Sequence, residues 1–207
     1  ISCNNISISF IATASTDVLP SDRRKNLQVI VHNCAGKSVG NFEITVTASV
    51  EANSGAHAHH DANRPTGQIA RSNQTTGTTT ATLTTNANGI ATFDFIAPDP
   101  AGNHTLAIRC ASSAYDCAGF NLPINVTVPG LVLAHNGYFR YVGDSGNGSK
   151  HDLSHYIKPS SLDVLRRIAA DYHREFCEGL TLNDISLPQG GRFDIYNNWT
   201  RSHFEHR

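Results

Sequence analysis

The chain has 207 residues, a length that suits one or two domains. Hydrophobic residues make up 39% of it and charged residues 16%, which excludes a protein that charge repulsion keeps disordered. The formal net charge of −1 excludes a strongly basic binder, so we expect no nucleic-acid partner. We expect no membrane span either, because no apolar run approaches the roughly 18 residues that one needs. The 11 His and 5 Cys raise the question of a metal.

The cysteines and the start of the sequence predict a protein outside the cytoplasm. The sequence contains no Met, and we expect a mature or trimmed N-terminus. Four cysteines in the first two-thirds allow three disulfide pairings; the short loop CASSAYDC favours Cys110 with Cys117, and free buried thiols are the alternative. Disulfides would place the protein in a secreted, periplasmic or cell-surface location. We expect Cys177, near a helix end, to be unpaired and partly buried.

Short runs of alternating apolar and polar residues predict an all-β region over residues 1–129. The turn Asn88-Gly89 is a strong hairpin signal because both residues tolerate a positive φ. The Thr-rich stretch 73–85 is expected at a strand edge or in a loop. Strands of this length at regular spacing, without helical periodicity, favour a β-sandwich. The other expected strands are Ile6–Ile11, Leu27–Val31, Phe42–Val50, His104–Arg109 and Leu122–Val128.

Two segments of this region carry a family resemblance. GKSVGNFEITVTA has a glycine turn before a strand, and TTNANGIATFDFIAPDPAGNHTLAIRC has an NxxGxAxFxF hairpin followed by GxHTL. Over about 100 residues the region resembles bacterial Ig-like domains of the invasin type. The resemblance implies an Ig-like β-sandwich that serves as a spacer, an adhesin or a targeting arm, and the fold alone does not choose among these.

A histidine cluster interrupts the strand pattern in the segment AHAHHDANRP. His57, His59, His60 and Asp61 could supply imidazole and carboxylate ligands for Zn, Cu or Ni. On a strand, His57 and His59 would face one way and His60 the other. The alternative is a solvated loop whose polar residues stay in contact with water.

The sequence changes character after Val128-Pro129-Gly130, and residues 130–207 predict a partial α+β domain. Ser160 and Asp163 fit a capping box at the start of a helix. Its apolar residues recur at helical spacing to about Cys177, and Gly179 ends the run. A strand is expected over Leu180–Leu187. The apolar residues of the helix pattern are Leu162, Leu165, Ile168, Ala169, Tyr172 and Phe176.

A further pair of histidines precedes this helix in HDLSHY. His151 and His155 are four residues apart, so on a helix they would lie on one face and could share a metal ion. The alternative is a pair of hydrogen-bonded surface histidines.

The stretch LNDISLPQGGRFDIYNNWTRSHFEHR carries a second resemblance. It follows a pattern D-x-S-L-P-x-G-G-x-F and then H-x-x-H, which resembles the zinc D-Ala-D-Ala-type peptidases, including the penicillin-insensitive murein endopeptidases with Hedgehog-like folds. The residues that match are Asp184, Ser186, Leu187, Pro188, Gly190, Gly191 and Phe193, followed by His203, His206 and Arg207.

This second resemblance implies a zinc cofactor and a peptide substrate such as peptidoglycan cross-links. His206 matches a zinc ligand, and His203 is a weaker candidate. Three protein ligands would leave one position for a water whose pKa falls toward about 7. The remaining ligands of the pattern would follow Arg207, so we expect an incomplete site and no peptidase activity in this chain. The alternative is a non-enzymatic Ig-like adhesin, spacer or metal-binding surface module.

Overall fold

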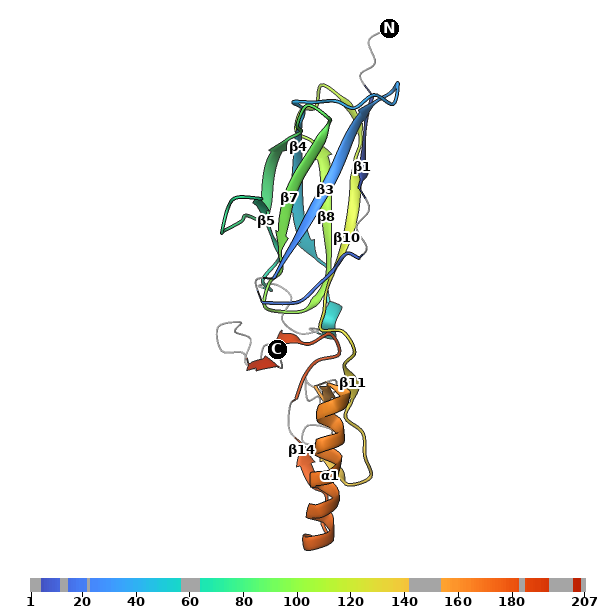
Figure 1. Cartoon of the computed structure of the whole chain (residues 1–207), viewed down its shortest axis with the longest axis vertical. Helices are drawn as coiled ribbons and strands as arrows, with labels where there is room; N and C mark the ends of the chain where they lie inside the picture. Colours follow the sequence, from blue (N-terminus) through green and yellow to red (C-terminus); the bar gives the residue numbers. More distant parts are fainter. Residues whose placement is uncertain are drawn as a thin grey trace. The chain divides into compact units, whose positions relative to one another are not determined.

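The computed structural model describes most of the chain, which divides into two units (Figure 1). Our division of the sequence at residue 129 stays a prediction; the structure groups two loops of the strand region with the later residues. The first unit comprises Ile1–Glu51, Pro65–Asp99 and Asn103–Val126, and the second Ala52–Arg64, Pro100–Gly102 and Thr127–Arg207. The described residues are 5–11, 15–21, 23–56, 64–141, 154–182, 185–193 and 203–205.

The first unit contains two five-stranded sheets. One sheet has the order β5 (Gln68–Arg71), β7 (Ile90–Ile96), β3 (Arg24–Asn33), β1 (Asn5–Phe10) and β9 (Asp116–Ala118). The other has the order β2 (Asp17–Val18), β10 (Phe120–Val126), β8 (Gly102–Cys110), β4 (Glu43–Val50) and β6 (Thr80–Thr84). The long strands pair antiparallel, whereas the short β9 and β2 add in parallel to β1 and β10.

The core of this unit lies between the two sheets. Leu27, Val29 and Val31 alternate along β3 and are fully buried, as are Phe93 and Phe95 on β7. Successive side chains of a strand point to opposite faces of its sheet, so every second residue faces the other sheet and is buried. Figure 1 shows β3, β5 and β7 in one layer and β4, β8 and β10 in the other. The fold is therefore the Ig-like β-sandwich that the sequence predicts.

The expected turn at Asn88-Gly89 is present, but the strands on its two sides, β6 and β7, do not pair with each other, so the hairpin prediction is wrong. Gly89 has a φ of 77°, a conformation that glycine adopts without a steric cost. The Gly89 N–H donates to the Asn86 carbonyl at 2.9 Å, and the Asn86 side-chain Oδ1 accepts from the backbone of Asn88 and Ile90. The turn joins β6 to β7, so it carries the chain from one sheet to the other.

The second unit is built from short strand pairs, a single-turn helix η1 (Ser54–Ala56) and the helix α1 (Pro159–Phe176). β11 (Val132–Leu133) pairs with β13 (Tyr156–Ile157), β12 (Phe139–Tyr141) with β14 (Leu180–Leu182), and β15 (Gly191–Phe193) with β16 (His203–Glu205). Its main cluster of buried apolar residues is Ala134, Phe139, Ile157, Leu162, Ala169 and Leu182, and Ala101, Val128 and Leu187 are also buried. Among the described residues, no helix combines the length and apolar character that a membrane crossing requires.

The ends of α1 differ from the expectation. Pro159 is the first helical residue and Lys158 the N-cap without a side-chain cap, so the capping box of Ser160 with Asp163 is wrong. The fixed φ of proline suits the first helical position, and this places Ser160 inside the helix. Cys177, not Gly179, takes the left-handed conformation at the C-terminal end, and its N–H donates to His173 at 2.8 Å.

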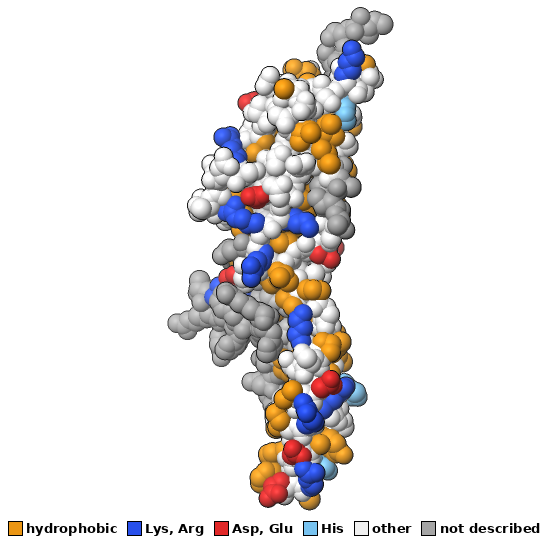
Figure 2. Space-filling view, viewed as in Figure 1, with side chains coloured by type: hydrophobic (Ala, Val, Ile, Leu, Met, Phe, Trp, Pro, Cys, Tyr) orange, Lys and Arg blue, Asp and Glu red, His pale blue; other side chains and the backbone are white. Residues whose placement is uncertain are grey.

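The helix also exposes part of its apolar stripe. Leu162 and Ala169 are buried, but Ile168 is 51% and Phe176 59% exposed. Figure 2 shows hydrophobic side chains interleaved with charged ones over this part of the second unit. Cys177 is a free thiol as expected, but it is exposed rather than partly buried, because it lies beyond the last helical turn. The expected strand 180–187 ends at Leu182, and the next described residues join a single bridge between His155 and Ser186.

A disulfide joins Cys110 to Cys117, the pairing that the short CASSAYDC loop favours. It ties the end of β8 to β9, which belongs to the other sheet. Cys34 is also disulfide-bonded.

Candidate functional site

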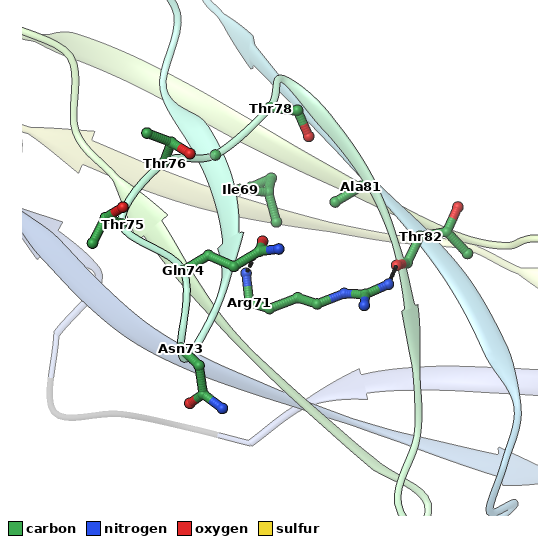
Figure 3. Close-up of a pocket in the computed structure, with 10 residues that line it drawn as sticks. Ile69, Arg71, Asn73, Gln74, Thr75, Thr76, Thr78, Ala81 and Thr82 are labelled. Atoms are coloured by element: carbon green, nitrogen blue, oxygen red, sulfur yellow. Dashed lines mark hydrogen bonds between the residues drawn. The ribbon is translucent and has the colours of Figure 1, made fainter.

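The first unit carries a polar groove of about 630 Å³ (Figure 3). β5 is the end strand of one sheet and β6 the end strand of the other, and the segment that connects them forms the groove wall. Most of the lining side chains carry hydroxyl or amide groups. The described lining residues are Ile69, Arg71, Asn73, Gln74, Thr75, Thr76, Gly77, Thr78, Ala81 and Thr82.

Arg71 crosses this groove and is the one ionisable residue in the described lining. Its Nη2 donates to the Thr82 carbonyl on β6 at 3.4 Å, a long hydrogen bond. A turn fixes its backbone, because Gln74 N–H donates to the Arg71 carbonyl at 2.9 Å and the Gln74 side chain accepts from the Arg71 N–H at 3.4 Å. The groove therefore presents a positive charge among neutral polar groups, an arrangement that suits an anionic ligand.

The neighbouring charges do not cancel this cation. Arg24 bonds to the Asp94 carboxylate at 3.2 Å, and its other terminal nitrogen donates to the Thr75 carbonyl at 2.5 Å. Asn26 also donates to Asp94, at 2.8 Å. The Asp94 carboxylate is thus engaged by two other side chains, and the Arg24 contact anchors the groove wall at Thr75.

In the second unit, the SLPQGG segment is part of the buried structure. Ser186 is almost fully buried; its N–H donates to Ser154 at 2.8 Å, and its carbonyl accepts from Tyr156 at 2.9 Å. Its hydroxyl donates to the Leu187 carbonyl at 3.1 Å. These bonds make Ser186 a structural residue that joins the segment to β13.

The two glycines give the segment its turn. Gly190 and Gly191 have φ values of 72° and 77°, and Gly190 N–H donates to the Leu187 carbonyl at 2.9 Å after Pro188. A Cβ on Gly190 would lie 2.7 Å from a methyl carbon of Val128. The turn therefore requires glycine both for its backbone conformation and for its close packing.

His155 lies beside this segment and is only 3% exposed. Its ring packs edge-to-face against Tyr141 with centroids 4.7 Å apart, and its backbone bridges to Ser186. Its Nε2 is buried without a hydrogen-bond partner among the described residues. The structure thus brings together His155 and Ser186, which the sequence analysis took from separate motifs, and it corrects the view of His155 as a surface histidine.

The other predicted ligands are not tested by the structure. His203 lies on β16, where its backbone pairs with Phe193. Among the described residues no group of three His, Cys, Asp or Glu could hold a metal ion. Zinc therefore stays a prediction. Several residues that the sequence analysis singled out lie outside the described ranges: His57, His59, His60, Asp61, His151, Asp184 and His206.

Sequence reasoning missed two arginines with defined roles. One is Arg71; its only signal is that it is the one cation near a long run of Thr, Asn and Gln. The other is Arg64, which is almost fully buried in the second unit. Its guanidinium donates to the carbonyl of Ser54 at 2.8 Å and to the carbonyl of Ala101, so it joins two loops that are distant in sequence. No sequence signal distinguishes Arg64 from a surface arginine.

No protein-family model matches the chain, and no curated protein matches it in sequence. It is similar in structure to the Lin-41 filamin domain, with 13% identity over 57% of this chain and 90% of that one and a TM-score of 0.37. The Escherichia coli adhesin FdeC gives 9% identity over 63% of this chain and 33% of that one, with a TM-score of 0.37. A conjugative transposon lipoprotein from Bacteroides eggerthii gives 11% identity over 58% of this chain and 95% of that one, with a TM-score of 0.34. Similarities this low say nothing about function.

Proposed function

We propose that this chain is a non-enzymatic Ig-like module of an extracytoplasmic protein, and that its first unit acts as a binding arm. The observation that carries the proposal is the groove with Arg71, which is built on a disulfide-bearing two-sheet sandwich. A sandwich with a continuous core is a rigid support, and the end strands and loops of such a fold are where binding residues are held.

The disulfide supports the location. Cys110–Cys117 and the disulfide of Cys34 would be reduced in most cytoplasms, whereas they persist in the periplasm and outside the cell. A secreted, periplasmic or cell-surface protein follows from this argument as part of the proposal.

A hydrolysis assay tests the non-enzymatic character. The 207-residue chain and a chain extended past Arg207 in its parent sequence, each loaded with one equivalent of zinc, are incubated with cross-linked peptidoglycan fragments, and the products are separated by chromatography. We expect no cleavage from a chain that circular dichroism shows to be folded. Cleavage that requires zinc and disappears in His206→Ala would overturn the proposal.

A second candidate function rests on the buried SLPQGG segment. Ser186 and Gly190 belong to this segment, and Ser186 forms a backbone bridge with His155. The imidazole of His155 is buried, and its Nε2 has no hydrogen-bond partner among the described residues. We propose as the alternative that the second unit belongs to a zinc peptidase that acts on peptides such as peptidoglycan cross-links, with His206 as a zinc ligand.

A zinc titration by calorimetry separates the metal sites of this alternative. If it holds, zinc binds a chain that is extended past Arg207 in its parent sequence, and His206→Ala abolishes that binding while the double variant His57→Ala, His59→Ala preserves it. The opposite pattern would assign the metal to the cluster His57–Asp61 and to a metal-binding surface module. Absence of binding by the extended chain at equimolar zinc would reject both.

A further inference from the structure

The strand β6 has one edge without a partner strand among the described residues. On its paired side, Ala48 N–H donates to the Thr79 carbonyl at 2.8 Å and Thr85 N–H donates to the Phe42 carbonyl at 2.9 Å, so odd-numbered residues face β4. In an antiparallel pair the N–H and C=O of one residue point to the same side, and the side alternates along the strand. The backbone groups of Thr80, Thr82 and Thr84 therefore point away from β4.

Side chains, not strands, bond to two of the three outward carbonyls of this edge. The Thr78 hydroxyl donates to the Thr80 carbonyl at 2.6 Å, and Arg71 Nη2 donates to the Thr82 carbonyl at 3.4 Å. Figure 3 shows the Arg71 side chain extended from β5 to Thr82. Such contacts can give way to a new strand by rotation of a side chain, with no rearrangement of the sheet.

The opposite wall of the groove is fixed by backbone bonds. Ile69 N–H donates to Thr78 at 2.7 Å, and Thr78 N–H donates back to Ile69 at 3.0 Å. This bridge closes the outer edge of β5 at Ile69, which leaves β6 as the edge of the groove that can accept a strand.

The chemistry of the lining selects the kind of strand. A guanidinium carries five N–H donors, and the contact with Thr82 uses one of them. No described lining residue is acidic, so a carboxylate that enters the groove meets a positive charge and no negative one. The described lining also has no aromatic side chain on which a sugar ring could stack, which favours a peptide over a glycan.

We propose that the groove between β5 and β6 is a docking site for an extended acidic peptide. The peptide adds as a strand to Thr80–Thr84, and one of its carboxylates binds Arg71 in place of the Thr82 carbonyl. This inference names the partner of the binding arm proposed above and rests on that function. The test below measures peptide binding, whereas the proposed function would be overturned by hydrolysis. The failure of one can therefore be told from the failure of the other.

Fluorescence anisotropy with synthetic peptides tests the site. The probe is a labelled peptide of about nine residues, the upper range of a strand, with alternating Thr and Val and a central Glu. Matched peptides carry Lys or Gln in place of Glu, or a Pro beside it. We expect saturable binding of the Glu peptide, weaker binding of the Gln peptide, and little binding of the Lys and Pro peptides.

Variants of the chain locate the binding. Arg71→Gln keeps a polar side chain, although a shorter one, and removes its charge. We expect about tenfold weaker binding of the Glu peptide, the loss of one charge-assisted contact. Thr82→Pro removes the outward N–H of the β6 edge, where proline is tolerated, and should weaken binding further. Arg167→Gln, on the exposed side of α1, is the matched control and should leave the affinity unchanged.

Four results would overturn the proposal. Equal affinity for the Glu, Gln and Lys peptides, or no binding of any, would remove the acidic strand as the ligand. Stronger binding of the Glu peptide by Arg71→Gln would mean that Arg71 prevents strands from pairing with the β6 edge. Binding of an oligogalacturonate with no binding of the peptides would assign the groove to an acidic glycan.

Discussion

The two units of the chain bury their apolar side chains to very different extents. The first has a continuous core from both sheets, in which residues such as Leu27, Phe93 and Phe95 are fully buried. The main hydrophobic cluster of the second has six described buried members, and its helix leaves Ile168 and Phe176 more than half exposed. Because the free energy of folding follows the apolar area removed from water, most of the stability resides in the sandwich.

The difference has a functional meaning. A binding groove needs a support that keeps its shape, and the groove with Arg71 lies on the unit with the larger core. The second unit instead relies on hydrogen bonds and special backbone positions, such as Ser186, Arg64 and Gly190. Perturbations of the two units should therefore differ in size and in kind.

The largest effect is expected from Phe93→Ala in the sandwich core. The loss of a fully buried aromatic side chain costs about 3–5 kcal/mol of unfolding free energy, through the transfer term and the cavity that remains. Urea unfolding followed by circular dichroism measures it. Phe139→Ala is the matched change in the second unit, and an equal or greater loss there would break the comparison.

Removal of the disulfide should have the next largest effect. The double variant Cys110→Ala, Cys117→Ala should lose about 2–3 kcal/mol, at the lower end of the usual range because the bridged residues are only seven apart. The urea midpoint of the sandwich reports the change. Cys177→Ala, which removes the exposed free thiol, is the control, and a comparable loss there would contradict the account.

Gly190→Ala should destabilise the second unit by about 1–3 kcal/mol. The residue has a positive φ, and the new Cβ would lie 2.7 Å from the Val128 side chain. Gly137→Ala is a matched control, since a Cβ there meets no atom within 4 Å. Amide hydrogen exchange resolved by segment measures both variants. Equal effects of the two would show that the SLPQGG turn is not a fixed element.

The smallest effect is expected on the exposed face of α1. Ile168→Gln should change the stability by less than about 0.5 kcal/mol, because the side chain is 51% exposed. Ala169→Leu, one residue away but fully buried, should cost about 1–3 kcal/mol through overpacking. The loss of helix signal on heating compares them. A large loss in Ile168→Gln would mean that the stripe is covered in solution.

Much of the fold follows from local patterns in the sequence. Alternation places strands at β3, β4, β7 and β8, and Asn88-Gly89 encodes its turn, because both signals act over a few neighbouring residues. The turn did not make a hairpin, because β6 and β7 pair in different sheets and the choice of partner strand is long-range. The ends of α1 were less predictable. The helix begins at Pro159 and its C-cap is Cys177, whereas Ser160 and Gly179 have the stronger capping propensities. Strand 180–187 was too long because its alternation continues into residues that make only a single bridge.

The sites were less predictable for a different reason. The groove forms where the end strands of two sheets, β5 and β6, lie next to the segment between them, and strand order is not contained in a local period. Nothing in the sequence marks Arg71 as the residue that spans it. The contact of His155 with Ser186 is also long-range, so the histidine resembled a surface residue until its neighbours were known.

Hydrogen exchange of the full chain in increasing urea tests the division into two unequal units most directly. The account predicts that amides of α1 and of the pair β12–β14 exchange through an opening of lower free energy, while β3, β4 and β7 remain protected to a higher urea concentration. Exchange of all these segments through one opening, with the same free energy and the same dependence on urea, would contradict it.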